Sequence, residues 1–321
     1  MTTIMDAEEL SACLRQYGLQ ARRAARPLPG GHVGSTVVVP TSQGPLAVKR
    51  FGGRFDAART RLAAEAHQFA AISGLAPPVR LTLSGELTTE INDATYMITE
   101  YIDPACPPEL TDFAVALAAL HVRLEGFRPD GRCADFLELS DPSALGLERV
   151  LRRTQDKACR EVVEWRMRIL ADYGLGSQTV ATTHHSWIHG DARPDNLLTT
   201  TCTAGRHLFI DFDQVSRFPR PYEVVRGYVA FVGPELPDYL VDSTFRSYLG
   251  AYHAVMPISA VDRALMVDLY ITVQAAETRT FTTPEGEIRG MHAFARARHQ
   301  QLTWIIEHRD LLHRVAEEVW P

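Results

Sequence analysis

The sequence predicts an α+β protein with two lobes, a small β-rich lobe over residues 1–101 and a larger, mainly helical lobe over residues 102–321. Before Tyr101, short runs of β-branched and aromatic residues show the pattern of strands. After Pro104, apolar residues recur every three or four positions, which is the spacing of amphipathic helices. A chain of 321 residues is long enough for one large domain or two ordinary ones.

The first lobe is expected to contain two helices and four strands. The helices are expected at residues 7–17 and 57–72, and the strands at 36–39, 46–50, 79–83 and 96–102. One face of the second helix carries Leu62, Glu65, Phe69 and Ile72. Because an unpaired buried charge is costly, Glu65 on this apolar face either pairs with a cation or lies at its solvated rim.

The second lobe is expected to begin with a helix in which apolar residues repeat every four, three and four positions. These residues are Phe113, Leu117, Leu120 and Leu124. A further helical region is predicted at 143–172. Residues 222–320 predict several amphipathic helices, interrupted near Pro234, Pro257 and Pro284.

Composition and charge exclude several classes of protein. The chain has 33 Lys and Arg against 39 Asp and Glu, a net charge of -6, so it offers no general basic field for nucleic acid or an anionic membrane. The five cysteines form no CxxC pair, and the apolar runs are too short to span a bilayer. The acidic N-terminal residues do not resemble a signal peptide. We expect a cytoplasmic protein whose partner is a small molecule; the sequence does not indicate its oligomeric state.

Clustered acids indicate where the chemistry lies. A loop within 187–198 has the pattern His-Gly-Asp-x4-Asn, formed by His189, Gly190, Asp191 and Asn196, and an apolar strand then ends in Asp211 and Asp213. Carboxylates this close repel one another unless a cation or hydrogen-bond donors offset the charge. Asp and Asn oxygens suit Mg²⁺, which commonly shares its coordination with nucleotide phosphates. The pattern therefore predicts chemistry with ATP and Mg²⁺.

With these motifs the chain resembles the aminoglycoside phosphotransferase and choline kinase-like family of small-molecule kinases, which has the bilobal protein-kinase-like fold. The resemblance implies that Asp191 is the catalytic base that receives or orients the acceptor's hydroxyl proton. It implies that Asn196 and Asp211 bind Mg²⁺. It assigns His189 to bracing the loop rather than to proton transfer, and it leaves the role of Asp213 open.

A glycine-rich segment resembles the loop that covers the phosphates of ATP in this family. Its candidate residues are Gly30, Gly31, Gly34 and Ser35. Glycines allow backbone N–H groups to approach phosphate, and a serine adds a hydroxyl donor. The segment is not a Walker A motif, and an ordinary glycine-rich β-turn is the alternative interpretation.

Two further parts of the nucleotide site follow from the resemblance. Lys49 matches the strand lysine that contacts the α- and β-phosphates, with Glu65 as its partner; the alternative is a solvated lysine. The backbone of Glu100 and Ile102 matches the hinge that hydrogen-bonds the purine, with Ile98 beside it; the alternative is a plain core strand.

The resemblance implies transfer of the γ-phosphoryl group of ATP to a hydroxyl of a small molecule. A natural-product antibiotic such as an aminoglycoside, modified to give resistance, is the first candidate acceptor, and homoserine, choline, a sugar or a nucleoside is the alternative. From another class, a nucleotide-binding pseudokinase or regulatory module is possible, although Lys49, Asp191, Asn196 and Asp211 are all present. A protein kinase is disfavoured because Gly190 replaces the usual arginine.

Charged residues give conflicting indications about the acceptor. A polycation would suit acids near the hinge, for which Asp103, Glu109 and Asp112 are the candidates. An acceptor with a carboxylate or phosphate would suit arginines, for which Arg193, Arg217, Arg220 and Arg226 are the candidates. These arginines could equally be structural partners of acids such as Glu223.

Overall fold

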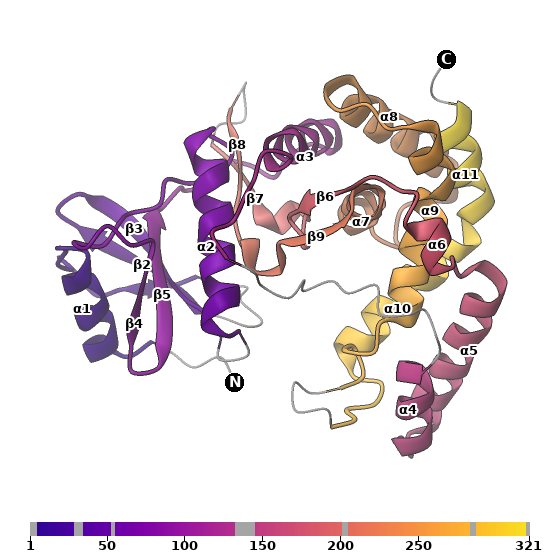
Figure 1. Cartoon of the computed structure of the whole chain (residues 1–321), viewed down its shortest axis with the longest axis horizontal. Helices are drawn as coiled ribbons and strands as arrows, with labels where there is room; N and C mark the ends of the chain where they lie inside the picture. Colours follow the sequence, from indigo (N-terminus) through magenta and orange to yellow (C-terminus); the bar gives the residue numbers. More distant parts are fainter. Residues whose placement is uncertain are drawn as a thin grey trace.

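The computed structural model has the α+β architecture that the sequence predicts, with a β-sheet followed by a larger array of helices (Figure 1). The residues that the structure describes are 5–28, 35–52, 55–131, 145–200, 205–282 and 287–318. The last strand of the sheet ends at Glu100, and the next helix begins at Leu110. The division that we predict at residue 101 lies between these two elements. Among the described residues, no helix is both long and apolar enough to cross a membrane.

The N-terminal sheet has five antiparallel strands in the order β1-β2-β3-β5-β4. Their bounds are β1 Arg26–Pro27, β2 Ser35–Thr41, β3 Gly44–Arg50, β4 Thr88–Ile91 and β5 Ala94–Glu100. Helix α1, Ala7–Gln16, covers the sheet by burying Leu10, Cys13 and Leu14 against its valines. Lys49 lies opposite Thr36 on β2 and Met97 on β5, so the central strands fix its position.

The strand predicted at 79–83 is reduced to an isolated bridge between Val79 and Thr99 of β5, and β4 pairs with the earlier part of β5. Residues 82–86 form a turn in which the Thr82 hydroxyl accepts from the Glu86 N–H. The β4–β5 hairpin turns at Asn92 and Asp93, whose φ angles are +48° and +62°. Asn and Asp tolerate this left-handed conformation better than other residues, so this dipeptide was the available signal.

The C-terminal part consists of helices around two small β-hairpins. The helices are α3 Leu110–Leu124, α4 Leu145–Arg153, α5 Lys157–Tyr173, α6 Ser177–Val180, α7 Arg220–Val232, α8 Asp238–Val255, α9 Ala260–Ala276, α10 Ala293–Glu307 and α11 Arg309–Glu318. The hairpins pair β6 His185–Ile188 with β9 Ser216–Pro219, and β7 Leu197–Thr199 with β8 His207–Phe209. The four apolar residues predicted to line the face of α3 are all completely buried.

The observed helix ends agree in part with the interruptions that the prolines predict. Helices α7 and α8 end at Val232 and Val255, shortly before Pro234 and Pro257, whereas Pro284 lies outside the described residues. The helical region predicted at 143–172 is divided into α4 and α5. Asp156 caps α5 by accepting the Ala158 N–H at 3.0 Å, which explains the new helix start.

Helix α2, Ala57–Ile72, lies between the sheet and the helical lobe (Figure 1). The face we predicted to be apolar is only partly buried, since Ile72 is 70% exposed. The buried side of the helix instead includes Arg59, Ala63 and Ala70. Small side chains let the helix approach its neighbours closely, and Arg59 hydrogen-bonds to backbone carbonyls that follow Asp211.

His67 on α2 should make the protein less stable at mildly acidic pH. Its Nε2 donates to the Pro77 carbonyl at 2.9 Å, and burial lowers the pKa of the imidazole to about 4. Because this pKa lies below the value near 6.5 in an unfolded chain, protonation favours unfolding, and stability is lost as the pH falls from 6.5 towards 4. The loss expected from His67 between pH 7 and pH 5 is about 2 kcal/mol.

Urea denaturation of the wild type and His67→Gln at pH 7 and pH 5 measures this contribution. Glutamine can keep the bond to Pro77 but does not titrate, so the pH-dependent loss should be smaller in the variant by about 2 kcal/mol. Burial also lowers the pKa of His121, so some acid sensitivity persists in both proteins. An equal loss in both proteins would exclude His67 as its source.

Candidate active site

The loop that carries Asp191 follows β6 and is held from below by a buried carboxylate. Glu223 on α7 is completely buried and accepts the backbone N–H groups of His189 at 2.8 Å and Gly190 at 2.6 Å. It also pairs with His121 of α3 at 2.9 Å. His121 Nδ1 contacts the Tyr252 hydroxyl at 2.7 Å, so α3, α7 and α8 together fix the backbone of the loop.

The sequence alone does not indicate these supports. From the sequence, Glu223 is expected only as a partner for arginines, and His121 has no expected role. The available signal was a single acid or histidine within an otherwise apolar helical run, at 222–225 for Glu223 and at 113–122 for His121. Such a residue needs a buried partner, and here the two residues are partners of each other.

His189 braces the loop, as the resemblance implies. Its Nδ1 accepts the Asp191 N–H at 3.2 Å, so Nε2 carries the proton and donates to the Ile210 carbonyl at 2.9 Å. The ring therefore joins the loop to the strand end just before Asp211. Since both ring nitrogens bond to the backbone, we assign His189 a structural role.

Gly190 is the one residue of the loop that cannot carry a side chain. Its φ is +80°, and a Cβ atom there would lie 2.0 Å from the Gln214 carbonyl oxygen. We expect Gly190→Ala to displace the Asp191 loop or the segment around Gln214. The variant should lose about 1–3 kcal/mol of folding stability and most of its activity. Chemical denaturation and an activity assay check this. Gly176→Ala is the control, because its Cβ would meet no atom within 4 Å. Equal effects of the two variants would contradict the steric argument.

The Asp191 carboxylate is oriented by two neighbours. Oδ1 accepts Arg226 Nη2 from α7, and Oδ2 accepts Asn196 Nδ2 at 3.3 Å. Asn196 Nδ2 also donates to the Asp191 carbonyl at 2.9 Å. The amide nitrogen of Asn196 thus serves Asp191, which leaves its Oδ1 as an acceptor for a cation.

Lys49 joins the sheet to the predicted metal site. Its Nζ lies 2.5 Å from Oδ1 of Asp211 and 2.5 Å from Oδ1 of Asp213. Burial raises the pKa of the Asp211 carboxyl, but the Lys49 ammonium outweighs this effect and lowers it. At Asp213, burial and the neighbouring charge of Asp211 raise the pKa in spite of Lys49. The three side chains form one coupled ionic group.

Asp211 has a backbone conformation that is unusual for a residue with a side chain. Its φ and ψ are +67° and +56°, in the left-handed region, which costs energy for residues other than glycine. Its side chain is 42% exposed although it takes part in the ion pair. The strained turn presents a carboxylate where a ligand can reach it.

The donor atoms at this site suit Mg²⁺. Asn196 contributes an amide oxygen, and Asp211, with Asp213 beside it, contributes carboxylate oxygens, which are the hard ligands this ion prefers. In the described parts of the chain, no three His, Cys, Asp or Glu side chains converge to hold a metal by themselves. An ion here would need further oxygens, which bound phosphates and water can provide.

The predicted partnership of Lys49 with Glu65 is wrong. Glu65 accepts the Asp130 N–H at 3.2 Å, while Lys49 binds Asp211 and Asp213. Successive residues of an α-helix are about 100° apart around its axis, so Glu65, two residues after Ala63, lies nearly opposite the buried face that contains Ala63. Hydrogen bonds from Arg59 fix the helix in this orientation, so the carboxylate points away from the lysine.

Arg59 provides the contact that sets the orientation of α2. Its Nε donates to the Asp213 carbonyl at 2.8 Å, and its Nη2 donates to the carbonyls of Asp213 at 2.7 Å and Val215. The side chain is only 5% exposed. Arg59 thus connects the first helical turn of α2 to residues 213–215, a role that no sequence pattern indicates.

The other predicted nucleotide residues lie along the sheet. The Ser35 hydroxyl, at the start of β2, is buried and has no hydrogen-bond partner among the described residues, which fits a donor to phosphate. Gly30, Gly31 and Gly34 lie outside the described residues. At the end of β5 the Glu100 N–H donates to the Pro78 carbonyl at 2.9 Å, so only its carbonyl can serve a purine. Within the described chain, the Ile102 N–H has no hydrogen-bond partner.

Three of the four candidate arginines have an acid within ion-pair distance. Arg226 binds Asp191, and Arg220 contacts Glu125 at 3.4 Å, whereas Glu223 supports the catalytic loop. Arg193 Nε lies 4.0 Å from Asp191 Oδ2. The expectation of structural pairing therefore holds for Arg220 and Arg226, although their partners are not Glu223.

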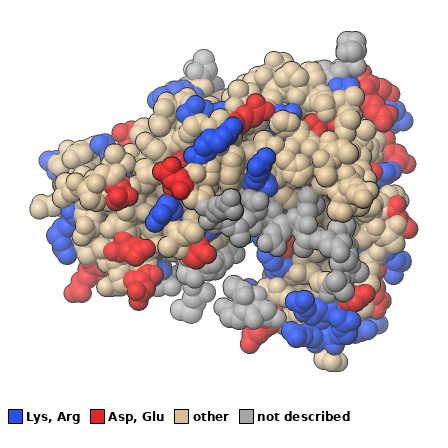
Figure 2. Space-filling model, in the orientation of Figure 1, with Lys and Arg blue, Asp and Glu red and all other residues tan. Residues whose placement is uncertain are grey.

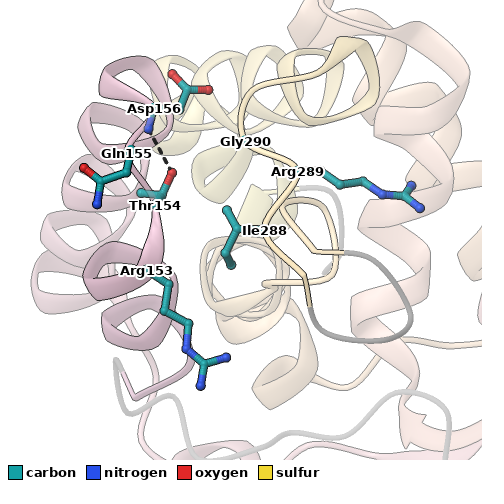
Figure 3. A pocket seen from close by; sticks show the side chains of 7 residues that line it. All are labelled: Arg153, Thr154, Gln155, Asp156, Ile288, Arg289 and Gly290. Carbon is teal, nitrogen blue, oxygen red and sulfur yellow. Dashed lines mark hydrogen bonds between the residues drawn. The ribbon is translucent and has the colours of Figure 1, made fainter.

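A pocket of about 190 Å³ lies away from this loop, between the end of α4, the start of α5 and residues 288–290 (Figure 3). Its two arginines, Arg153 and Arg289, extend in different directions. Figure 2 shows Lys and Arg gathered at the lower right, over α4 and α5. Because no predicted site residue lines this pocket, we assign it no part in the chemistry.

Comparisons with known proteins identify the family and the fold. The profile described as "Phosphotransferase enzyme family" matches residues 24–258. No curated protein sequence matches the chain. An aminoglycoside phosphotransferase from Alicyclobacillus acidocaldarius is 18% identical with a TM-score of 0.59, covering 96% of this chain and 95% of that one. A microcompartment-associated aminopropanol kinase is 15% identical with a TM-score of 0.64, covering 98% of this chain and 100% of that one. Choline kinase from Cryptosporidium parvum is 12% identical with a TM-score of 0.58, covering 90% of this chain and 89% of that one.

Proposed function

The chain belongs to the phosphotransferase enzyme family and is a small-molecule kinase, and we propose that it transfers the γ-phosphoryl group of ATP to a hydroxyl of its acceptor. One observation carries the proposal. The Asp191 carboxylate, oriented by Arg226 and Asn196, lies on the same loop as the candidate metal ligand Asn196. The Asn196 carbonyl accepts the N–H of Ile210, the residue directly before Asp211, which pairs with Lys49. A base, a cation site and a phosphate-binding lysine are the parts that phosphoryl transfer requires.

Asp191 orients the acceptor and receives its proton. The hydroxyl hydrogen-bonds to the carboxylate, which holds the oxygen in line with the γ-phosphorus. As the oxygen–phosphorus bond forms and the bond to ADP breaks, the hydroxyl proton passes to Asp191. Positioning accounts for most of the rate because the transition state is loose.

Lys49 and the two strand-end acids serve the nucleotide. When ATP binds, the Lys49 ammonium can exchange its carboxylate partners for phosphate oxygens, since both are anionic. Asn196 and Asp211 would hold Mg²⁺, which neutralises charge on the phosphates. Ser35, Gly30, Gly31 and Gly34 would cover the phosphates, and the backbone of Glu100 and Ile102 would receive the purine. We place the reaction in the cytoplasm, where ATP is available.

The family leaves the acceptor open. A natural-product antibiotic remains the first class to test, and the solved structures similar to this chain include a kinase of spectinomycin and a kinase of amicoumacin. A metabolite with a hydroxyl, such as homoserine, choline, a sugar or a nucleoside, is the second class, and aminopropanol and choline kinases are equally similar in fold.

ADP release tests the proposal. Purified protein with ATP and Mg²⁺ is offered aminoglycosides, other antibiotics, nucleosides, homoserine, choline and sugars. Turnover that depends on one acceptor and disappears in Asp191→Asn would support phosphoryl transfer. If the wild type binds ATP in a thermal-shift assay but no acceptor stimulates it, a regulatory nucleotide-binding role is favoured instead.

A further inference from the structure

Three arginine side chains lie within electrostatic range of Tyr222, one helical turn before Arg226 on α7, and a fourth arginine lies near one of them. They are Arg166 on α5, Arg226 on α7, Arg279 after α9 and Arg298 on α10. Helix α9 packs against α5, α7 and α10, which brings these segments together (Figure 1). Burial raises the pKa of the Tyr222 hydroxyl, and the charges of Arg226, Arg298 and Arg279 oppose that rise, so all three lie within electrostatic range of it.

Among the described residues, the carboxylates that bond to this arginine cluster are fewer than its positive charges. Arg226 is paired with Asp191, and Arg279 Nε donates to Glu277 Oε1 at 2.8 Å. Glu223 also lies near Tyr222, but its carboxylate is occupied by the catalytic loop and His121. Within the described chain, neither Arg166 nor Arg298 has a carboxylate partner.

Arg166 and Arg298 show how the excess charge is accommodated. Arg166 is 1% exposed, donates to the Glu277 carbonyl at 2.8 Å and lies over the Phe281 ring, but its Nε has no hydrogen-bond partner among the described residues. Burial and the nearby Arg298 charge lower the pKa of Arg166 to about 10, against the attraction of Glu277. Arg298 is partly buried and has only the neutral Gln301 Oε1, at 3.2 Å, and the face of Phe294.

We propose that the arginine cluster binds a negatively charged group of the acceptor, a carboxylate or a phosphate, while Asp191 orients the hydroxyl to be phosphorylated. Arg298 and Arg279, the more accessible members, contact the anion, because a guanidinium offers paired donors to these groups. Arg166 is too buried for contact and adds positive potential. Arg226 links the cluster to Asp191. The inference rests on the proposed function and disfavours a polycationic aminoglycoside as acceptor.

Anion binding can be tested without catalysis. Inorganic phosphate is titrated at constant ionic strength with ADP and Mg²⁺ saturating, so that the nucleotide site is occupied. Phosphate should raise the Tm of the wild type but not that of Arg298→Gln. The control variant Arg168→Gln removes an exposed arginine of α5, and phosphate should raise its Tm as it does that of the wild type. Without phosphate, Arg298→Gln should be no less stable than the wild type, because it relieves repulsion. A phosphate effect that is absent from the wild type, or the same in all three proteins, would overturn the proposal.

Matched acceptors test the same inference through turnover. Glycerol 3-phosphate is compared with glycerol, and homoserine with its amide, so that the pairs distinguish phosphate from carboxylate. The anionic member should be preferred, and Arg298→Gln should weaken its use about 10- to 100-fold through KM, with partial rescue by Arg298→Lys. Turnover of neutral acceptors alone would refute the anion site but leave the kinase function standing. Phosphate binding without turnover of any acceptor would support the anion site but contradict the kinase function.

Discussion

Asp191→Asn is expected to lower kcat by about 10²- to 10⁴-fold, the range that removal of a general base produces. The amide keeps the shape of the side chain and can still hydrogen-bond, but it cannot receive the proton of the acceptor hydroxyl. Asp191 bonds to the predicted Mg²⁺ ligand Asn196 but to none of the residues predicted to bind the nucleotide itself, so KM for ATP should change much less than kcat. Steady-state ADP release with a saturating acceptor measures both constants.

Two controls separate this chemical effect from a loss of structure. Asp195→Asn removes an exposed carboxylate four positions along the same loop and should leave kcat close to that of the wild type. Asp191→Asn itself should lower the Tm, because the buried Arg226 guanidinium loses its anionic partner. Nucleotide binding by the folded variant, measured calorimetrically, should persist. A variant that retains kcat would remove Asp191 from proton transfer.

Asp211→Asn is expected to lower kcat/KM by about 10²- to 10³-fold, as the loss of one electrostatic stabiliser of a transition state does. It removes the negative charge of a predicted Mg²⁺ ligand and one of the two carboxylates on Lys49. Asparagine tolerates the left-handed conformation at this position, so the fold should be retained. Activity is measured over a Mg²⁺ titration.

The Mg²⁺ dependence decides how this loss is interpreted. If Asp211 holds the ion, half-saturation should move to higher Mg²⁺ and excess Mg²⁺ should restore part of the activity. Asp103→Asn, which alters an exposed acid after the hinge, should leave the titration curve unchanged. An unchanged half-saturation in Asp211→Asn would exclude Asp211 as a ligand.

The sequence was sufficient for those features in which a local pattern determines the structure. The helical spacing of four apolar residues in α3 predicts a buried face, and all four of these residues are completely buried. The short loop with His189 and Asp191 could also be recognised, since its spacing alone brings these groups together. The bracing role of His189 agrees with its bonds to the backbone of Asp191 and Ile210.

The sequence was insufficient where one segment's position depends on a distant one. Glu65 has the right separation from Lys49, but the bonds of Arg59 to Asp213 and Val215 turn α2 so that Glu65 points elsewhere. The support of the loop by Glu223 depends on contacts between residues far apart in the chain. Periodicity gives the face of a helix but not the neighbour it meets, so such partners require the structure.

The central claim is that the γ-phosphoryl group of ATP ends on an acceptor hydroxyl, and its most direct test follows that group. The wild type and Asp191→Asn are incubated with γ-labelled ATP, Mg²⁺ and the acceptor that best stimulates ADP release, and the labelled products are separated and identified. The account predicts label in a phosphomonoester of the acceptor, formed by the wild type and nearly absent with the variant. Label found only in inorganic phosphate, or on the protein itself, would contradict it.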